Sequence, residues 1–200
     1  MKKIGEYWGK FVAFLNEDSW LSFVATLVLA FVVIKVLFFP FLSFVTGTSL
    51  PLVIVESCSM YHHDGLEGVL ENPVYDKWGI DLLSADNWDF KNGISKGDVI
   101  FIVGAKEVEI GDVIVFTPEG STSPYPIIHR VVTADETYST KGDNNGQQLT
   151  KDNNPHKTDE TAIMEDAIIG KALFKVPFIG WAKLIFFEGG RADNQKGMCR

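Results

Sequence analysis

The longest apolar stretch of the chain lies near its N-terminus. From Trp20 to Val45, Lys35 is the sole charged residue. A helix that crosses a bilayer needs about 20 mostly apolar residues, so residues 20–45 are predicted to form a transmembrane anchor. Lys35 is close enough to the far end for its ammonium group to reach the membrane surface. Pro40 is expected to end or kink the helix.

The length and the flanking residues of this segment indicate whether it is cleaved from the protein and in which direction it crosses the membrane. It is longer than the core of a cleaved signal peptide, which favours a retained anchor, although the small residues between Ser43 and Ser49 leave cleavage open. Three lysines precede the segment, whereas no Lys or Arg lies between Val36 and Asp76. We expect a single-pass protein of the cell membrane. Because basic residues mark the cytoplasmic side, residues 1–19 would be cytoplasmic, and the residues that follow the anchor at 20–45 would be extracytoplasmic.

After the anchor, the pattern changes to short β-branched runs that follow turn residues, which is typical of strands. The first run begins at Val53 and ends in two serines that flank Cys58. Further runs are expected at residues 97–103, 111–116, 126–132, 138–141 and 167–174. Since little helical pattern appears outside the anchor, the fold class is predicted to be mostly β, with residues 46–187 forming a sandwich or barrel.

Three segments lack a strand pattern. Residues 62–96 are rich in Gly, Asn and Pro, which predicts a loop-like insertion that serves as a lid, a membrane-facing flap or a partner surface. Residues 147–160 are polar and are expected to form an exposed loop. An apolar stretch between residues 174 and 187 is expected to close the core or to lie against the bilayer. The tail, residues 188–200, is predicted to be flexible.

Composition narrows the possible partners. The net charge of −8 argues against nucleic acid, because phosphate binding needs clustered Lys and Arg. The two cysteines, Cys58 and Cys199, are far apart and do not suggest a disulfide framework. Cys58 is expected to point away from Ser59, as alternate residues of a strand do, and to act as a small apolar packing residue.

Ser59 and His129 are candidates for nucleophilic catalysis. A serine hydroxyl is a weak nucleophile until a nearby base takes its proton, and histidine suits that role near neutral pH. Spacing alone does not pair two residues that lie seventy positions apart. A serine after a strand is more often a turn residue, and a histidine among apolar residues more often belongs to the core.

Four motifs in order change this balance. Ser57-Cys58-Ser59-Met60, directly after an N-terminal anchor, resembles the serine box of the type I signal peptidases, peptidase family S26. The runs at 111–116 and 127–132 resemble the two strands that precede and carry the family's base, and 140–145 resembles its Lys-Gly-Asp-Asn box. His129 stands where many bacterial enzymes have lysine, which is similar to the archaeal and endoplasmic-reticulum branch.

This resemblance implies a membrane-anchored serine endopeptidase that removes N-terminal signal peptides from translocated proteins. It implies Ser59 as nucleophile and His129 as general base, assisted by an aspartate. The aspartate is either Asp143, which matches the motif better, or Asp152. The Ser57 hydroxyl and the Ser59 backbone N–H would form the oxyanion hole. The family's preference for small side chains before the cut implies shallow apolar pockets, for which Ile54 and Val55 are the candidates.

The resemblance implies no cofactor, and its partners would be precursor proteins, membrane lipid and the protein-translocation machinery. Tyr61-His62 departs from the family's usual Glu-Pro after the methionine. A metal site at His62, His63 and Asp64 is disfavoured, because adjacent histidines do not easily share one ion. Two alternatives remain: a Ser/His hydrolase with a different substrate, and an inactive single-span protein that binds partners.

Overall fold

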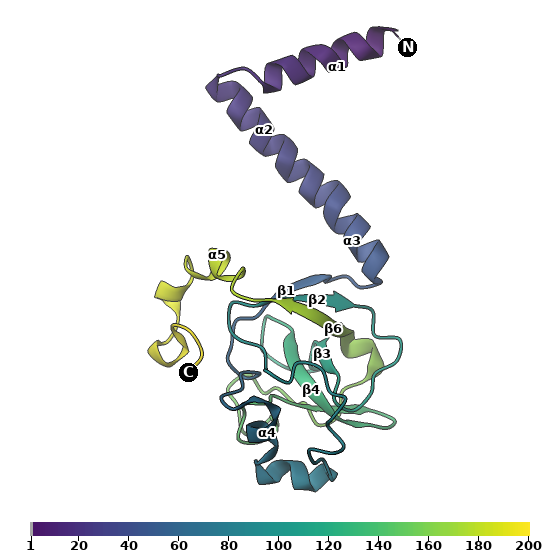
Figure 1. The fold of residues 1–200 in the computed structure, drawn as a ribbon, viewed down its shortest axis with the longest axis vertical. Helices are drawn as coiled ribbons and strands as arrows, with labels where there is room; N and C mark the ends of the chain where they lie inside the picture. The colour runs from purple at the N-terminus through teal and green to yellow at the C-terminus, as the bar shows by residue number, and fades with distance from the viewer. Residues whose placement is uncertain (1) are drawn as a thin grey trace. The chain divides into compact units, whose positions relative to one another are not determined.

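A computed structural model describes residues 2–200 of the chain. The chain divides into two compact units, one that ends at Val45 and one that spans Thr46–Arg200 (Figure 1). Each unit is described separately below.

The first unit is helical. Helix α1 spans Lys2–Leu15, and a continuous helical stretch follows from Trp20 to Thr46, made of α2 (Trp20–Val32), η1 (Val33–Phe38) and α3 (Phe39–Thr46). Ser19 caps α2, because its hydroxyl accepts a hydrogen bond from the Ser22 N–H at 3.1 Å. Among residues 2–200, Trp20–Thr46 is the one helix that is long and apolar enough to cross a membrane.

Pro40 does not end this helix, contrary to one of the two expectations from the sequence. Proline lacks an N–H and its ring crowds the carbonyl four residues earlier. The turn before it is wound as a π-helix, in which the Phe39 N–H donates to the Ile34 carbonyl. A wider turn of this kind accommodates an interruption of the α-helical hydrogen-bond pattern, and the helix continues to Thr46.

The second unit is organised by one antiparallel sheet of six strands rather than by the expected sandwich or barrel. The strand order is β1-β2-β6-β3-β4-β5. The strands are β1 (Leu52–Ile54), β2 (Val99–Val103), β3 (Val113–Phe116), β4 (Ile127–Ala134), β5 (Tyr138–Lys141) and β6 (Ile168–Val176). The predicted strands are confirmed to within a few residues, and the description as mostly β applies to this unit, since the long helices precede it.

The two ends of the strand order differ. Beyond β5, the chain near Ile163 forms a further bridge to Tyr138, and the Thr140 N–H donates to the Glu160 carbonyl at 2.9 Å. In the described part of the chain, β1 pairs with β2 alone. The outer edge of β1 is therefore open to another extended chain.

A core of β-branched and aliphatic side chains fills one side of the sheet. It contains Val55 and Met60, which flank the two serines, together with Ile94, Ile100 and Val115. Val55 is 2% exposed and Met60 1% exposed. Because both flanking side chains are buried, the serine segment between them is held against the sheet.

The predicted insertion, residues 62–96, is packed onto the sheet. It forms helix α4 (Gly65–Leu70) and the 3₁₀ helix η2 (Pro73–Trp78), and Figure 1 shows α4 in the same unit as β3 and β4. Tyr75 and Trp88 are buried in a cluster with Val132 of β4. A flexible loop would not bury two large aromatic side chains, so this segment is an integral part of the second unit.

The C-terminal residues, predicted to be a flexible tail, form short helical turns. Helix α5 (Trp181–Leu184) is followed by η4 (Glu188–Gly190) and η5 (Asp193–Gln195), while η3 (Glu165–Ala167) precedes β6. Cys199 forms a disulfide with Cys58, with Cα atoms 5.5 Å apart. The role given to Cys58 as a free packing residue was therefore wrong. The two cysteines lie 141 residues apart in the sequence, so their pairing depends on the tertiary fold and could not be predicted from local sequence.

Gly111 offers a test of how the insertion packs. A β-carbon at Gly111 would lie 2.2 Å from Trp88, whereas one at Gly120 would meet nothing within 4 Å, and both glycines have positive φ. We expect Gly120→Ala to lower the free energy of unfolding by about 1–2 kcal/mol through backbone strain. Gly111→Ala should lower it by about 1–3 kcal/mol more through overpacking. Urea unfolding followed by tryptophan fluorescence measures both, and equal effects would contradict this packing.

Candidate active site

Ser59 lies in a turn that follows the edge strand β1 after four intervening residues. The Tyr61 N–H donates to the Cys58 carbonyl at 3.1 Å and closes this turn. Asn144 holds it from the other side, since its N–H donates to the Ser59 carbonyl at 2.7 Å and its side-chain amide to the Cys58 carbonyl at 3.0 Å. The nucleophile candidate is thus fixed to the loop that contains the Gly-Asp-Asn sequence.

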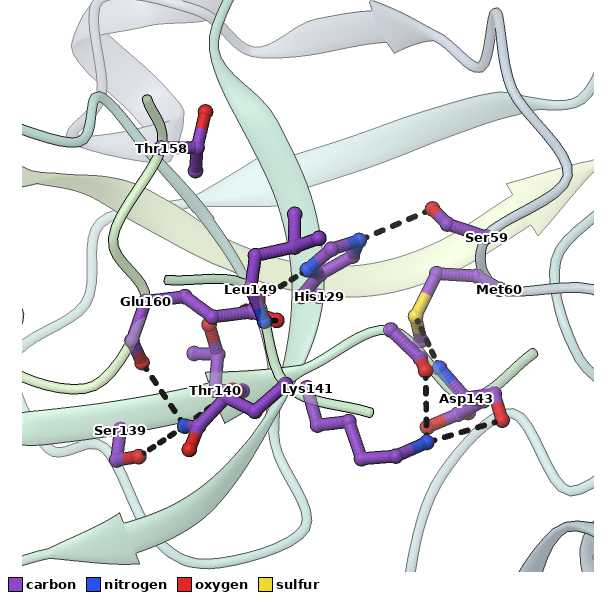
Figure 2. A network of polar contacts seen from close by, with 12 residues as sticks. Ser59, Met60, His129, Ser139, Thr140, Lys141, Asp143, Leu149, Thr158 and Glu160 are labelled. Carbon is purple, nitrogen blue, oxygen red and sulfur yellow. Dashed lines mark hydrogen bonds and ion pairs between the residues drawn. The ribbon is translucent and has the colours of Figure 1, made fainter. Parts of the chain in front are cut away.

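His129 lies in the middle of β4, opposite Ile114 of β3, and is 3% exposed. Its Nε2 atom is 3.0 Å from the Ser59 hydroxyl oxygen, which is hydrogen-bond distance (Figure 2). The structure therefore brings together the two residues that spacing alone could not pair.

Glu160 is the acid that contacts His129. Its carboxylate accepts a hydrogen bond from His129 Nδ1 and further ones from the Thr140 hydroxyl at 3.0 Å and the Leu149 N–H at 2.7 Å (Figure 2). Glu160 has no exposed surface. With the carboxylate on Nδ1, the neutral imidazole carries its proton there, and Nε2 is left to accept the proton of Ser59.

Neither aspartate that the sequence suggested contacts His129. The Asp143 carboxylate points to Arg130 and His62 rather than to the His129 imidazole, and Asp152 is exposed on a turn. Glu160 was missed because it lies in a polar stretch that was expected to be an exposed loop. That stretch runs beside β5 and places Glu160 beneath β4, which polarity alone does not indicate.

Comparisons with known proteins relate the chain to one group of proteins. No family model matches the chain. The chain is 29% identical over 101 residues to Signal peptidase complex catalytic subunit SEC11 of Colletotrichum graminicola, and 27% identical over 101 residues to its counterpart in Pyricularia oryzae. Each match covers 46% of this chain and 56% of the relative, so the chain spans about half the length of the curated relatives it matches. Over this stretch the chain is similar to signal peptidase catalytic subunits. The resemblance seen in the sequence motifs is thereby confirmed.

Asp143 and Arg130 form a buried ion pair beside Ser59 and His129. The Arg130 guanidinium donates from Nη2 at 2.8 Å and from Nε at 3.1 Å, and neither side chain is exposed. Burial alone would raise the pKa of Asp143. The charge of Arg130 and the hydrogen bonds from His62 and Arg130 outweigh it and lower the pKa to about 2. Asp143 is therefore ionised near neutral pH, where it is the partner of the Arg130 guanidinium.

His62 and Tyr75 complete the surroundings of Asp143. His62 Nε2 is 2.8 Å from the carboxylate and its Nδ1 is 3.0 Å from the Lys91 carbonyl. The Tyr75 hydroxyl lies 3.5 Å from Asp143, and burial, followed by the charge of Asp143, raises the pKa of Tyr75. The departure from the family pattern at Tyr61-His62 thus introduces a buried partner for the motif aspartate.

Lys141 does not contact Ser59. Its ammonium group donates to the carbonyls of Gly142 at 3.0 Å and Asp143 at 3.4 Å and lies over the Tyr75 ring. Burial lowers its pKa to about 8, against the opposing charges of Asp143 and Glu160. Lys141 therefore stabilises the loop rather than serving as a base for Ser59.

The His129 imidazole leaves no room for a side chain at Gly142. A β-carbon at this position would lie 2.7 Å from His129 Nε2 and 2.6 Å from the Asn145 amide nitrogen. Real β-carbons do not approach other atoms so closely, so a larger residue would displace the imidazole or the loop.

The remaining predicted site residues lie around Ser59. The Ser57 hydroxyl oxygen is 3.2 Å from that of Ser59 and is exposed, where it could face a developing oxyanion. Ile54 is half-buried at the edge strand. Val55, in contrast, is part of the core, so its side chain offers no surface to a substrate. Of the two proposed lining residues, Ile54 alone stays a candidate.

The histidine pair does not form a metal site with its neighbours. In the part of the chain that the structure describes, no group of three His, Cys, Asp or Glu side chains could hold a metal ion. His63 and Asp64 line a cavity of about 220 Å³ together with Asn144 and Glu71. His62 has both ring nitrogens occupied by the contacts described above, so neither is free for a ligand bond.

The pKa of Asp143 predicts a pH dependence of stability. Because the folded-state pKa of about 2 lies below the ordinary 3.8, ionised Asp143 stabilises the fold above about pH 4, and this contribution is lost as the pH falls through 2. We expect Asp143→Asn to lower the free energy of unfolding at pH 7 by about 3–5 kcal/mol. The difference from the wild type should shrink by roughly 2 kcal/mol between pH 4 and pH 2.

Denaturant unfolding across this pH range measures the difference. Asp152→Asn is the matched control, because Asp152 is exposed and should leave the pH profile of the wild type unchanged. A constant difference between the wild type and Asp143→Asn from pH 7 to pH 2 would show that Asp143 is not ionised in the folded protein.

Proposed function

We propose that this protein is a membrane-anchored serine endopeptidase that cleaves N-terminal signal peptides from translocated proteins. The observation that carries the proposal is the 3.0 Å contact between the Ser59 hydroxyl and His129 Nε2, with the Glu160 carboxylate on the opposite ring nitrogen. The homology to signal peptidase catalytic subunits supplies the substrate class.

The mechanism follows from the roles of the three side chains. His129 takes the proton of Ser59 as the oxygen attacks the scissile carbonyl, and Glu160 stabilises the imidazolium that forms. The Ser59 N–H and the Ser57 hydroxyl donate to the oxyanion. His129 then protonates the leaving amine, which frees the mature protein. A water molecule, activated by the same imidazole, hydrolyses the acyl-enzyme and releases the signal peptide.

The open edge of β1 provides a place for the substrate. An extended peptide that pairs with this edge would run directly towards Ser59, because β1 leads into the serine turn. Main-chain hydrogen bonds would hold the peptide in register, and Ile54 would contact a side chain before the cut.

The apolar helix and the disulfide support the proposed location. Residues 20–46 form the helix that could span the membrane, and the lysines that precede it favour a cytoplasmic N-terminus. The Cys58–Cys199 disulfide in the second unit supports an oxidising, extracytoplasmic compartment for Ser59. There an emerging precursor would meet the site, next to membrane lipid and the translocation machinery.

The two alternatives make different predictions about the same residues. An inactive partner-binding protein has no need of a buried carboxylate on a histidine that contacts a serine, so the geometry favours an enzyme. A Ser/His hydrolase of another substrate would share the catalytic residues but would not distinguish precursors by the side chains before the cut.

Loss of either catalytic side chain should abolish cleavage. We expect purified Ser59→Ala and His129→Ala proteins to cleave a precursor with small residues at −3 and −1 at least about 10³-fold more slowly than the wild type. The reason is that the Ser59 and His129 side chains act together in the proton transfer. Release of the mature protein, followed by gel electrophoresis, measures the rate. Ser49→Ala, an exposed serine ahead of β1, is the control and should keep full activity.

A precursor with bulky residues at −3 and −1 tests the substrate class. Wild-type protein should leave it uncut, whereas equal cleavage of both precursors would favour a hydrolase of broader substrate range. Full activity in folded Ser59→Ala would refute the mechanism.

Glu160 is expected to matter more for catalysis than either aspartate first considered. Glu160→Gln keeps the shape of the side chain but presents an amide that can donate to Nδ1 and so favours the wrong imidazole tautomer. The rate should fall by about 10³–10⁴-fold. Asp152→Asn is the control and should retain wild-type cleavage rates, since Asp152 is exposed. A Glu160→Gln protein with wild-type activity would remove Glu160 from the mechanism.

A further inference from the structure

The C-terminal residues 188–199, here called the strap, contact the segment that precedes Ser59. Two of the three residues before Ser59 are held by the strap, Glu56 through Arg191 and Cys58 through Cys199. The strap has no part in the chemistry of the proposed mechanism. Its contacts converge on the backbone that carries the nucleophile and the oxyanion donors.

Arg191 holds Glu56 at two points. Its guanidinium donates to the Glu56 carboxylate at 2.6 Å and to the Glu56 backbone carbonyl at 3.1 Å. A planar guanidinium can satisfy two such acceptors at once, whereas an ammonium group cannot do so with the same geometry. The contact to the carbonyl fixes the backbone itself, directly before Ser57.

Lys96 fastens the strap to the body of the second unit. Its ammonium group is 2.7 Å from the Glu188 carboxylate and donates to the Gln195 carbonyl at 2.7 Å. The side chain is 1% exposed and lies over the ring of Trp181. A buried lysine that bridges two points of the strap keeps it in place through contacts made outside the serine segment.

The Cys58–Cys199 disulfide is a covalent link between the strap and the serine segment. Cys58 lies between the two serines, and its bond to Cys199 ties the residue before Ser59 covalently to the strap. The Lys96 backbone N–H also donates to the Cys199 sulfur at 3.4 Å. On the other side of Ser59, Asn144 and Ile94 hold the backbone of residues 58–60. The nucleophile is therefore restrained from both directions along the chain.

We propose that the strap positions the nucleophile: Arg191 and Cys199 hold residues 56–58 so that Ser59 and its oxyanion donors stay aligned with His129. This inference rests on the proposed peptidase function. Displacement of a catalytic group by about 1 Å can cost roughly 100-fold in rate. Release of the strap should therefore lower kcat and leave substrate binding at the β1 edge largely intact.

The test uses the full-length protein, purified in detergent without reductant. Arg191→Ala and Cys199→Ser should each lower kcat by about tenfold or more, with KM changed by less than about threefold. Arg191→Lys should recover part of the loss, because lysine keeps the ion pair with Glu56 but not the second hydrogen bond. Lys196→Ala is the matched control: it also removes one strap cation, but its ion pair with exposed Asp193 does not reach the serine segment.

A small dithiol provides the same test without mutation. Its two thiols reduce the disulfide to the Cys58 and Cys199 thiols and leave the reagent as a cyclic disulfide. Wild-type kcat should fall to the level of Cys199→Ser, and the variant itself should not respond. Unchanged kcat in the reduced wild type and in Arg191→Ala would overturn the positioning role.

Hydrogen exchange separates this proposal from the peptidase function. The Tyr61 and Asn144 amides donate to the Cys58 and Ser59 carbonyls, so their exchange reports on the serine turn whether or not the protein cleaves a precursor. Exchange at these amides should accelerate by about tenfold or more when the strap is released. A wild type that cleaves nothing would refute the proposed function alone, whereas unchanged exchange would refute the strap.

Discussion

Arg130 and Asp143 form an ion pair with no exposed surface, and the parts of the active site are arranged around it. Arg130 follows His129 on β4, and Asp143 precedes Asn144, which holds the Ser59 carbonyl. The guanidinium also donates to the carbonyls of Asp89 and Gly111. One buried cation thus links β4, the insertion and the loop whose Asn144 holds the Ser59 turn.

Burial of the Arg130–Asp143 ion pair costs free energy, and hydrogen bonds from the surrounding residues offset this cost. Two charges lose several kcal/mol each on leaving water, and this loss is recovered when every hydrogen-bonding group finds a partner. Here His62 and Tyr75 contribute the remaining partners of Asp143. Adjacent residues of a strand point to opposite faces, so His129 and Arg130 serve different carboxylates: Glu160 for the base and Asp143 for the scaffold.

Much of the fold follows from local sequence, because β-branched runs between turn residues indicate strands. The same holds for Ser59 and His129, which lie in recognisable motifs. Glu160, by contrast, reaches its place through the path of a polar segment beside β5, and no local pattern encodes that path. The motif also places Asp143 in the loop beside the Ser59 turn. It does not predict which side chain the carboxylate contacts, because Arg130 and His62 lie elsewhere in the sequence. Cys199 and Arg191 were missed because polar C-terminal residues resemble a disordered tail until their partners are known.

The glycine beside the imidazole has a consequence for reading related sequences. Since a β-carbon at residue 142 would collide with His129 Nε2, the space for the ring exists only where this position has no side chain. A chain with the serine and histidine motifs but a larger residue here would lack room for its own base in this arrangement. The residue at position 142 therefore helps to distinguish related chains in which the serine and histidine can pair in this way from chains in which they cannot.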